Sequence, residues 1–428
     1  MSAIAPLSSP AMAPDASGGE LAGKHILVAL SGGIAGYKIA QLVRDLGRAG
    51  ATVQVMMSDA AQRFITPLTL QTLSGREVIT SSWQGRAGLD GNAMPHINAT
   101  READLMLVAP ASANTLAQIA LGLSDSLIGL TALARPPGCP LAVAPAMNRE
   151  MWANPATQRH VRQLAADGIA LWGPASGDQA CGETGDGRMI EPAELLERCI
   201  AALTPKTLAG RRVLVSAGPS FEALDPVRGL TNRSSGKMGF AIARAAAQAG
   251  AEVTLLAGPV SLPTPVGVRR VDFSSAQQLL DAALPLADQN DVFIATAAVA
   301  DWRPVEVSTH KIKKAPGSAP PAVAMTENPD VLATLAALPR ARSGQLYCVG
   351  FAAESQNLVE LASAKRLRKG IPLIVGNLGP DTFGRDDNSL TLIDASGAQT
   401  WPTASKTALA RRLVDEIARR LPPSSTAS

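Results

Sequence analysis

The sequence predicts an α/β protein built from two doubly wound, Rossmann-like domains. Three observations support this fold class. Short apolar runs alternate with helical patterns, which is typical of parallel sheets with crossover helices. The chain has 428 residues, which is too long for one ordinary domain. The rhythm of strand, loop and helix also restarts near residue 211, after the stretch LTPKTLAGRR.

The first half opens with an apolar strand, HILVALS at 25–31, which is followed by a helix that ends at Gly50. Three more apolar runs predict strands at 52–58, 103–112 and 140–147. The next helical pattern, MNREMWANPATQRHVRQLAADG, contains Pro155, which should interrupt it because proline cannot continue a helix.

The second half repeats this arrangement without repeating the sequence. Apolar runs predict the following strands: 211–218, 251–258, 290–302, 345–355 and 371–377. The first of these should lead into a helix over 236–250. The stretches SLTLID and AQTWPT predict a hairpin joined at ASG, and a helix over 405–421 closes the chain.

Composition separates tails from domains and excludes several classes of protein. Residues 1–23 are rich in Ala, Pro and Ser and predict a disordered tail, so the domains should span 24–203 and 210–421. A net charge of +3 with 3% aromatic residues predicts no nucleic-acid partner. No apolar run reaches about 18 residues, so we expect no membrane span. Four widely spaced cysteines predict no zinc site or disulfide framework and favour the cytoplasm.

The loops after the first-half strands are where ligands should bind, because they follow the carboxyl ends of parallel strands. Gly32 and Gly33 in ALSGGIAGYK would let backbone N–H groups approach a phosphate. The GxGxxG spacing is missing, so a dinucleotide fingerprint is not supported, and a tight turn without ligand stays an alternative. The polar residues of APASANT would cap a helix or hold a ligand. His96 lies in a predicted loop, where a surface histidine is commoner than a base.

The glycine-rich stretch at 176–189, SGDQACGETGDGRM, contains a cysteine where a core can hardly form. Four glycines should make the segment mobile. Its acidic residues should raise the pKa of Cys181, which suits a proton donor better than a standing thiolate. An incidental loop cysteine is the alternative reading.

Six segments, taken together and in order, identify the first half. SGGIAGYK, FITPLTLQ, PHIN, APASANT, APAMNREMW and SGDQACGETGDGRM resemble the flavin-containing cysteine decarboxylases over residues 24–203. The specific resemblance is to the phosphopantothenoylcysteine decarboxylase half of the bifunctional bacterial coenzyme A enzymes. The resemblance implies a flavodoxin-like flavoprotein domain that holds FMN between subunits.

The resemblance also implies roles for individual residues. Positions that match the family's FMN-binding loops are Gly33, Ser58, Ser112, Asn114 and Thr115. His96 matches the catalytic histidine, Asn148 the asparagine that holds the substrate, and Cys181 the cysteine on the substrate lid. Flavin would first oxidise the thiol side of the substrate, which gives the departing CO2 an electron sink, and a neutral Cys181 would then donate a proton.

Two loops of the second half suit a nucleotide. The loop at 216–239 looks like a P-loop, but Gly229 precedes Gly236 and Lys237 at the wrong spacing, so we reject a Walker A motif. Its polar residues still suit a phosphate at a helix start. Asp301 follows a strand end and precedes Lys311 of KIKK, and a carboxylate with lysines is expected chemistry for Mg2+ and a triphosphate.

These loops resemble phosphopantothenate–cysteine ligase over residues 210–421. The matching segments are SAGPSFEALDPVR, TNRSSGKMG, AAVADWRP, KIKK, ENPDVL, VGFAAE and KRLRKG. The resemblance assigns Asn232 to the acyl-cytidylate step, Lys311 to catalysis and Asp301 to the metal. The positions that match CTP-binding residues are Ala295, Thr296, Ala297, Asp301, Lys311, Pro329, Asp330, Val331, Leu332, Phe351, Lys365 and Lys369. Ser220 and Phe221 replace the threonine and arginine that are common in the family.

The implied activity is CTP-dependent ligation of 4'-phosphopantothenate with cysteine, followed by FMN-dependent decarboxylation to 4'-phosphopantetheine. The implied assembly is a homo-oligomer, a dodecamer built from trimers of one domain and dimers of the other. Two alternatives are disfavoured: the complete second half argues against a flavin decarboxylase for peptidyl cysteines, and the presence of His96, Asn148 and Cys181 argues against a flavin-bound regulatory subunit without catalysis. The missing GxGxxG disfavours an NAD-dependent dehydrogenase.

Overall fold

The computed structural model describes residues 19–83, 94–179, 182–313, 322–354, 356–378 and 384–422. The chain forms two compact units that divide between Leu203 and Thr204. This division lies in the stretch where the sequence places a linker. Across the described residues, no helix combines the length and apolar character needed to cross a bilayer.

Unit 1 is built on a parallel sheet of five strands in the order β2-β1-β3-β4-β5. This order is that of flavodoxin-like doubly wound folds. The strands are β1 His25–Leu30, β2 Thr52–Met57, β3 Leu105–Ala111, β4 Leu141–Pro145 and β5 Ala170–Leu171. The helices are η1 Ile34–Gly36, α1 Tyr37–Arg48, η2 Ala61–Arg63, α2 Pro67–Ser74, α3 Pro95–Arg101, α4 Ala113–Leu121, α5 Leu127–Ala134, α6 Arg149–Ala153, α7 Pro155–Ala166 and α8 Pro192–Leu203.

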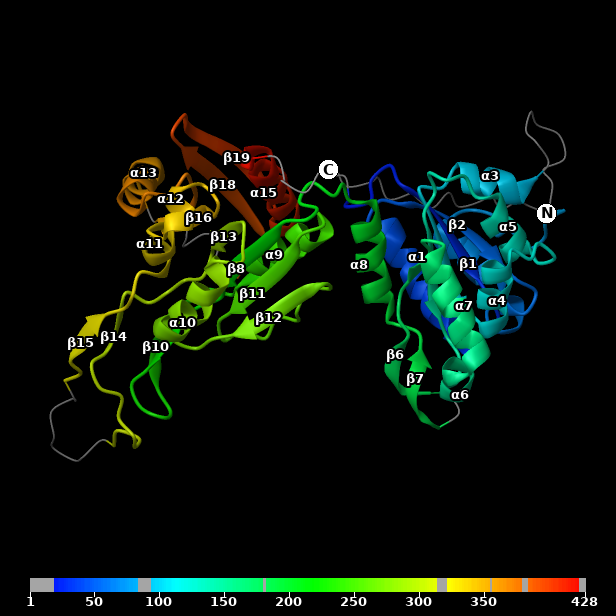
Figure 1. Ribbon diagram of the computed structural model, residues 1–428, viewed down its shortest axis with the longest axis horizontal. Helices are drawn as coiled ribbons and strands as arrows, with labels where there is room; N and C mark the ends of the chain where they lie inside the picture. Colours follow the sequence, from blue (N-terminus) through cyan, green and yellow to red (C-terminus); the bar gives the residue numbers. More distant parts are fainter. Residues whose placement is uncertain are drawn as a thin grey trace, which may run out of the picture. The chain divides into compact units, whose positions relative to one another are not determined.

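Alternation of buried residues along β1 explains why helices cover both faces of this sheet. Ile26 and Val28 belong to one apolar cluster, which α1 and α8 cover, whereas Leu27 and Ala29 belong to a second cluster with residues of α4, α5 and α7 (Figure 1). Successive side chains of a strand point to opposite faces, so a fully apolar strand needs two apolar layers.

The glycine-rich stretch forms a hairpin, where the sequence led us to expect a mobile loop. β6 Ala175–Asp178 pairs antiparallel with β7 Thr184–Arg188. Gly177, Gly185 and Gly187 all have positive φ, which glycine adopts at no steric cost. A Cβ on Gly187 would lie 2.3 Å from the carbonyl oxygen of Met147, so only glycine lets this strand approach the segment after β4 so closely.

A half-buried ion pair ties the end of this hairpin to α1. The Nζ atom of Lys38, on the buried side of α1, lies 2.7 Å from a carboxylate oxygen of Glu191. Arg188 contacts the same oxygen at 2.6 Å. The hydrogen bond from Lys38, followed by the one from Arg188, holds the pKa of Glu191 below its ordinary value against the opposing effect of burial.

Unit 2 is built on a mixed sheet of eight strands in the order β12-β11-β8-β13-β16-β17-β18-β19. Its first six strands are parallel and follow the Rossmann order, and the last two are antiparallel. The strands are β8 Arg212–Ala217, β11 Glu252–Ala257, β12 Val268–Asp272, β13 Val292–Ala295, β16 Tyr347–Glu354, β17 Leu373–Leu378, β18 Asp387–Asp394 and β19 Gly397–Ser405.

Helices cover both faces of the second sheet as well. α9 Lys237–Gln248 and α15 Lys406–Arg420 bury one face, while α10 Ala276–Ala287, α11 Val331–Ala336 and α13 Leu358–Lys369 pack with the other (Figure 1). The short helix α12 Pro339–Arg342 follows α11. Two small antiparallel pairs stand outside the main sheet: β9 Phe221–Ala223 with β10 Gly229–Thr231, and β14 Trp302–Pro304 with β15 Met325–Glu327.

Several expected elements are present and one boundary differs. The predicted hairpin near the C-terminus is β18 with β19, and Pro155 begins α7 as its first residue. The tail was expected to end at residue 23, but Leu21 is buried in the core of unit 1, so ordered structure begins earlier than expected. Residues 1–18 and 423–428 lie outside the described residues.

Asp394 at the end of β18 provides a test of how the closing helix is attached. It accepts hydrogen bonds from Ser396 and from Arg420 of α15. These bonds lower the pKa of Asp394 to about 2, although burial opposes them. The ionised carboxylate therefore stabilises the fold above pH 4, and this contribution is lost as the pH falls from about 4 to about 2.

Between neutral and acid pH, the free energy of unfolding should fall by about 2 kcal/mol less in Asp394→Asn than in the parent. Urea unfolding of unit 2, followed at pH 5 and pH 2.5 in the parent and the variant, measures it. Equal pH dependence in the two proteins would show that Asp394 is not the group that titrates.

Candidate functional site

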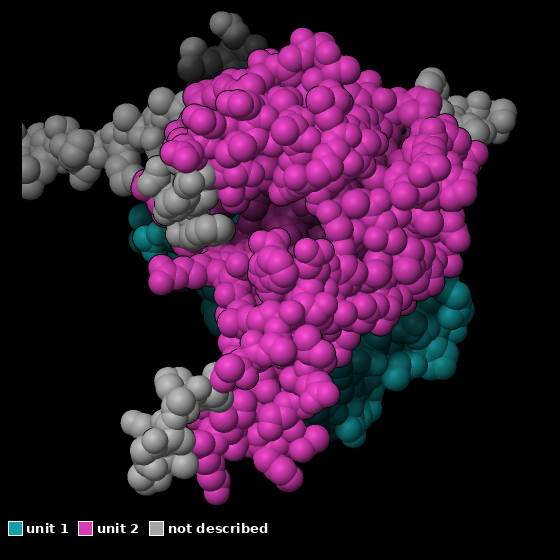
Figure 2. All heavy atoms as spheres, turned by 90° about the vertical axis from the view of Figure 1, so that its left-hand side faces the viewer, with its two compact units in different colours: residues 1–203 teal, residues 204–428 magenta. Residues whose placement is uncertain are grey.

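Unit 2 contains a cavity of about 1100 Å3 at the carboxyl ends of β8, β13 and β16. The strand order reverses between β8 and β13, and crevices at such a reversal are where open α/β sheets bind ligands. Figure 2 shows a deep hollow in the surface of unit 2. The cavity is therefore the best-formed candidate site among the described residues.

Nearly all residues that the sequence assigned to CTP line this one cavity, although they come from separate segments of the chain. The lining includes Asn232 and the predicted residues Ala295, Thr296, Ala297, Asp301, Pro329, Asp330, Val331, Leu332, Phe351, Lys365 and Lys369. These segments follow β10 and β15, lie at the end of β13 and in the loop after it, lie within β16, or lie on α11 and α13. The parallel sheet brings them together because its strand ends meet at one edge.

The start of α9 is an anion site at the wall of this cavity. Gly236 has φ 74° and makes no side-chain cap, so the first N–H groups of the helix face the cavity that Gly236 lines. A Cβ on Gly239 would lie 2.2 Å from the hydroxyl of Thr296. Glycine here lets α9 pack closely on the ends of β8 and β13, so its N-terminus reaches the ligand position.

Two lysines of α13 supply cationic groups held in a partly buried setting. Lys365 donates to the carbonyl oxygen of Phe351 at 3.1 Å, and Lys369 pairs with Asp330 at 2.8 Å. Burial, followed by the charge of Lys369, lowers the pKa of Lys365, because each disfavours a further cation there. An anionic ligand would relieve both effects. Burial acts to raise the pKa of Asp330, but the hydrogen bonds from Lys369 and from the N–H of Ala333, together with the charges of Lys369 and Lys365, outweigh it and hold that pKa below its ordinary value.

Further cationic side chains line the cavity. Arg233 and Lys237 belong to the loop whose polar residues the sequence predicted to suit a phosphate, whereas Arg368 and Lys406 were not assigned to the nucleotide. Lys406 is buried at the first position of α15, and burial together with Lys237 lowers its pKa. Lys237 pairs with Asp386 at 2.7 Å. Lys406 stands about 170 residues from Lys237 in the chain, so no local motif could have joined the two.

Ser220 stands where the family commonly has threonine, and the loop around it shows how the serine is accommodated. Ser220 is fully buried and its hydroxyl accepts a hydrogen bond from the N–H of Ala300 at 3.0 Å. Asn232 donates to the carbonyl oxygen of Ala298 at 2.9 Å. The serine thus keeps the bonding of a hydroxyl at this position. Phe221 lies against Gly229, where a Cβ would approach its ring to 2.5 Å.

Lys311 is not among the residues that line the cavity, and its side chain is exposed. The contacts of the next residue, Ile312, hold this segment in place. The N–H of Ile312 donates to the buried carboxylate of Asp225 at 3.1 Å, and Arg228 donates to the carbonyl oxygen of Ile312. This ties the segment to the loop between β9 and β10. Lys311 therefore lies outside the cavity lining, its role beside the triphosphate stays a prediction, and Lys314 lies outside the described residues.

Asp301 lines the cavity and is exposed, so it could contribute one oxygen to a divalent cation. Among the described residues, no cluster of three or more His, Cys, Asp or Glu side chains could hold a metal by itself. A Mg2+ ion at Asp301 would need phosphate oxygens of a nucleotide for its other ligands, which is the usual arrangement for this ion.

The predicted FMN-binding residues of unit 1 lie in loops at the carboxyl ends of β1, β2 and β3. Backbone bonds join these loops: the N–H of Ser58 donates to Leu30, and that of Ser31 to Pro110. Ser31 also accepts from the N–H of Ser112 at 2.8 Å. The strand order reverses between β1 and β3 at this point. The sheet therefore brings these predicted residues to one edge.

The donors at this edge fit a flavin phosphate. Ser112 caps α4, and its hydroxyl lies 3.0 Å from that of Thr115. Asn114 is in the same first turn. A hydroxyl-rich helix start is a ready anion site. A Cβ on Gly33 would have its nearest contact at 3.8 Å, so the backbone at Gly33 is open to a ligand.

His96 lies in the first turn of α3, where the sequence led us to expect a loop. Pro95 begins this helix, and proline at the first helical position is a start signal that the sequence reading missed. The Nδ1 atom of His96 is buried and has no hydrogen-bond partner among the described residues. A buried polar atom without a partner usually marks a place that a ligand or water completes.

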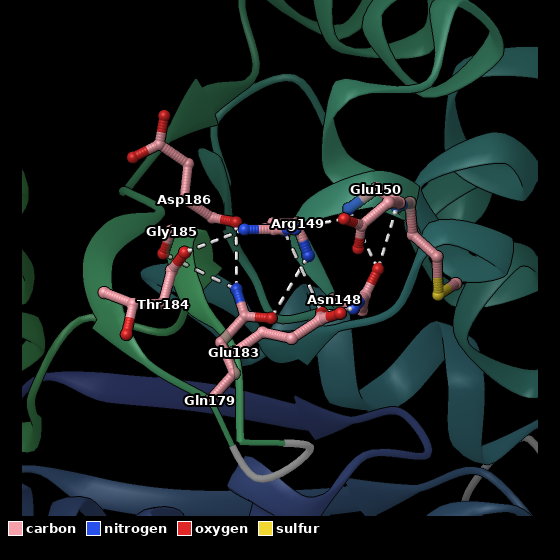
Figure 3. A network of polar contacts seen from close by, with 9 residues as sticks. Asn148, Arg149, Glu150, Gln179, Glu183, Thr184, Gly185 and Asp186 are labelled. Atoms are coloured by element: carbon pink, nitrogen blue, oxygen red, sulfur yellow. Dashed lines mark hydrogen bonds and ion pairs between the residues drawn. The ribbon is translucent and has the colours of Figure 1, made fainter.

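Asn148 caps α6 and takes part in a polar network with the β6–β7 hairpin (Figure 3). Its side-chain oxygen accepts from the N–H of Glu150, and its amide nitrogen donates to Glu183 at 2.5 Å. Gln179 of the hairpin accepts from the N–H of Arg149 at 3.1 Å. The hairpin is thus docked on the loop that carries the predicted substrate asparagine. Cys181 lies outside the described residues.

Comparison with known proteins agrees with both halves of this reading. A family model described as flavoprotein matches residues 15–204, and one described as DNA/pantothenate metabolism flavoprotein C-terminal domain matches residues 208–421. A crystal structure of the C-terminal domain of a coenzyme A biosynthesis bifunctional protein CoaBC is 37% identical, with a TM-score of 0.43. It covers 50% of this chain and 97% of that chain.

Two curated relatives match almost the whole chain. The coenzyme A biosynthesis bifunctional protein CoaBC of Vibrio cholerae serotype O1 is 48% identical over 400 residues, which are 93% of this chain and 98% of the relative. The protein of the same name from Escherichia coli strain K12 is 45% identical over 405 residues, or 94% and 98% of the two chains. The chain belongs to the family of bifunctional coenzyme A biosynthesis proteins.

Proposed function

We propose that unit 2 is a CTP-dependent phosphopantothenate–cysteine ligase. One cavity at the strand-order reversal is lined by predicted nucleotide residues from separate segments of the chain. This observation carries the proposal. The carboxylate of 4'-phosphopantothenate attacks the α-phosphate of CTP, pyrophosphate leaves, and the amine of cysteine then displaces CMP. Cationic side chains offset the negative charge that develops on phosphate in such a transfer.

Each predicted residue then has a physical task. Lys365 and Lys369 on α13, with the N-terminus of α9, hold phosphate groups, and Phe351 lines the cavity between them. Asp301 holds Mg2+ together with phosphate oxygens. Asn232 positions the acyl-cytidylate. The role of Lys311 stays a prediction that rests on the family resemblance.

Unit 1 is the FMN-dependent phosphopantothenoylcysteine decarboxylase. When bound, FMN supplies reversible oxidation of the thiol-bearing carbon, which provides the electron sink that loss of CO2 needs. Gly33, Ser58, Ser112, Asn114 and Thr115 hold the cofactor. In the same unit His96 acts as a base or acid through its unpartnered Nδ1, Asn148 holds the substrate and Cys181 donates a proton.

The two reactions run in sequence, because the cysteine adduct made by unit 2 is the substrate of unit 1. We place the protein in the cytoplasm, as a homo-oligomer of twelve chains. Support for association comes from unit 1, where the exposed apolar side chains near α1 and α2 are Ile34, Tyr37, Phe64 and Leu68.

Product analysis tests the whole proposal. The purified protein receives 4'-phosphopantothenate, cysteine and Mg2+ with CTP or, in parallel, with ATP, and mass spectrometry identifies the products. We expect 4'-phosphopantetheine and CMP, with CTP preferred. The cysteine adduct alone would refute the assignment of unit 1, and no product from either nucleotide would refute both assignments.

Replacing Lys365 with methionine should weaken nucleotide binding. The change removes one charged contact, which is worth about 1.5–3 kcal/mol, so KM for CTP should rise about tenfold to a hundredfold. Decarboxylation of supplied cysteine adduct should not change. Lys206→Met is the matched control, since this lysine also donates to a backbone carbonyl but lies outside the cavity. An unchanged KM for CTP in Lys365→Met would remove Lys365 from the site.

Replacing His96 with asparagine should lower kcat of decarboxylation by about a hundredfold or more, which is the usual loss of a general acid or base. The flavin absorbance of the purified protein and the ligase rate should stay unchanged. His160→Asn on α7 is the control. Decarboxylation at the parental rate in His96→Asn would rule out a catalytic role for this histidine.

A further inference from the structure

The side-chain amide of Asn148 is held in one orientation. Its oxygen accepts from the N–H of Glu150 at 2.9 Å and from the N–H of Met151 at 3.3 Å. Only the oxygen of an amide can accept from these two backbone donors, so the nitrogen must point to the opposite side. Figure 3 shows that this side faces the β6–β7 hairpin.

The group that Asn148 meets on the hairpin is a carboxylate. Its Nδ2 atom donates to an oxygen of Glu183 at 2.5 Å. Glu183 is half-buried. The Nε atom of Arg149 lies 4.0 Å from the same oxygen and also contacts Glu150 at 2.6 Å. The donor that the resemblance assigns to the substrate is therefore engaged with an anion of this chain itself.

We propose that Glu183 is a specificity-determining residue, whose carboxylate competes with that of the substrate for the amide of Asn148. The proposal rests on the decarboxylase function proposed above, in which the substrate carries a carboxylate that leaves as CO2. An incoming carboxylate must displace Glu183 to reach the fixed Nδ2 atom. A ligand without this carboxylate leaves the bond between Asn148 and Glu183 intact.

Two features make displacement the expected outcome rather than sharing. Two carboxylates on one amide nitrogen would lie within a few ångströms of each other, and like charges at that distance repel. Arg149 offers the displaced carboxylate a cation that is already at the limit of an ion pair. Glu183 can therefore move from Asn148 to Arg149 without losing all of its charge compensation.

The competition for Asn148 ends when the substrate loses CO2. Loss of CO2 removes the group that displaced Glu183, so the product no longer holds Asn148. The glutamate then regains its hydrogen bond, and the product has lost one of its contacts. Glu183 thus lowers the affinity for the acid and leaves the affinity for the decarboxylated product unchanged.

Calorimetry on the flavin-loaded protein with two unreactive ligands tests this. 4'-Phosphopantothenoylserine carries the carboxylate, and 4'-phosphopantothenoylaminoethanol lacks only that group. In Glu183→Gln the competing bond loses its charge, and a neutral hydrogen bond is about half as strong as a charged one. We expect Kd of the carboxylate ligand to fall about fivefold, and Kd of the other ligand to stay within twofold.

Asp186→Asn is the matched control. It removes the same charge from the same hairpin, and its side chain points away from Asn148 (Figure 3). Both affinities should match the parent. An equal or higher Kd of the carboxylate ligand in Glu183→Gln would overturn the proposal, as would a parallel change for both ligands, which indicates a merely structural glutamate. If the parent bound neither ligand, the decarboxylase assignment itself would fail.

Discussion

The reversal of strand order within a parallel sheet is the constraint on which both candidate sites depend. Parallel strands end at one edge, and where neighbouring crossovers diverge they leave a crevice between loops. Unit 1 reverses between β1 and β3, and unit 2 between β8 and β13. Loops that are far apart in sequence meet there, and hydrogen bonds such as those of Ser31 with Pro110 and of Asn232 with Ala298 join them. This is why residues near 232, 301, 330 and 365 line one cavity.

Charge determines what the second of these crevices can hold. Arg233, Lys237 and Lys406 line one cavity with two lysines of α13, and the open N-terminus of α9 adds partial positive charge. Burial, followed by the charge of Lys369, lowers the pKa of Lys365, so holding this cation beside another one in the free protein carries a cost. A polyanionic ligand removes that cost on binding, so the arrangement favours a nucleotide triphosphate over a neutral ligand.

The sequence predicted most of the fold because its strands are apolar on both faces and its helices are amphipathic. It also predicted that residues after strand ends would gather at one edge, and in unit 2 most of the residues predicted for the nucleotide line one cavity. It missed what depends on long-range packing. The β6–β7 hairpin reads as a loop, since its pairing relies on positive φ angles and on docking against Met147. Lys406 carries no local signal in the sequence. The hydrogen bond from Ile312, the neighbour of Lys311, to Asp225 joins positions that are 87 residues apart.

The most direct test of two independent sites is complementation between two single variants. Asn232→Ala should form no cysteine adduct yet decarboxylate supplied adduct, and Asn148→Ala should accumulate the adduct. Mixed together with 4'-phosphopantothenate, cysteine, CTP and Mg2+, the two variants should restore 4'-phosphopantetheine in the mass spectrum. Loss of both reactions in either variant, or a mixture that yields only the adduct, would contradict the assignment of one reaction to each unit.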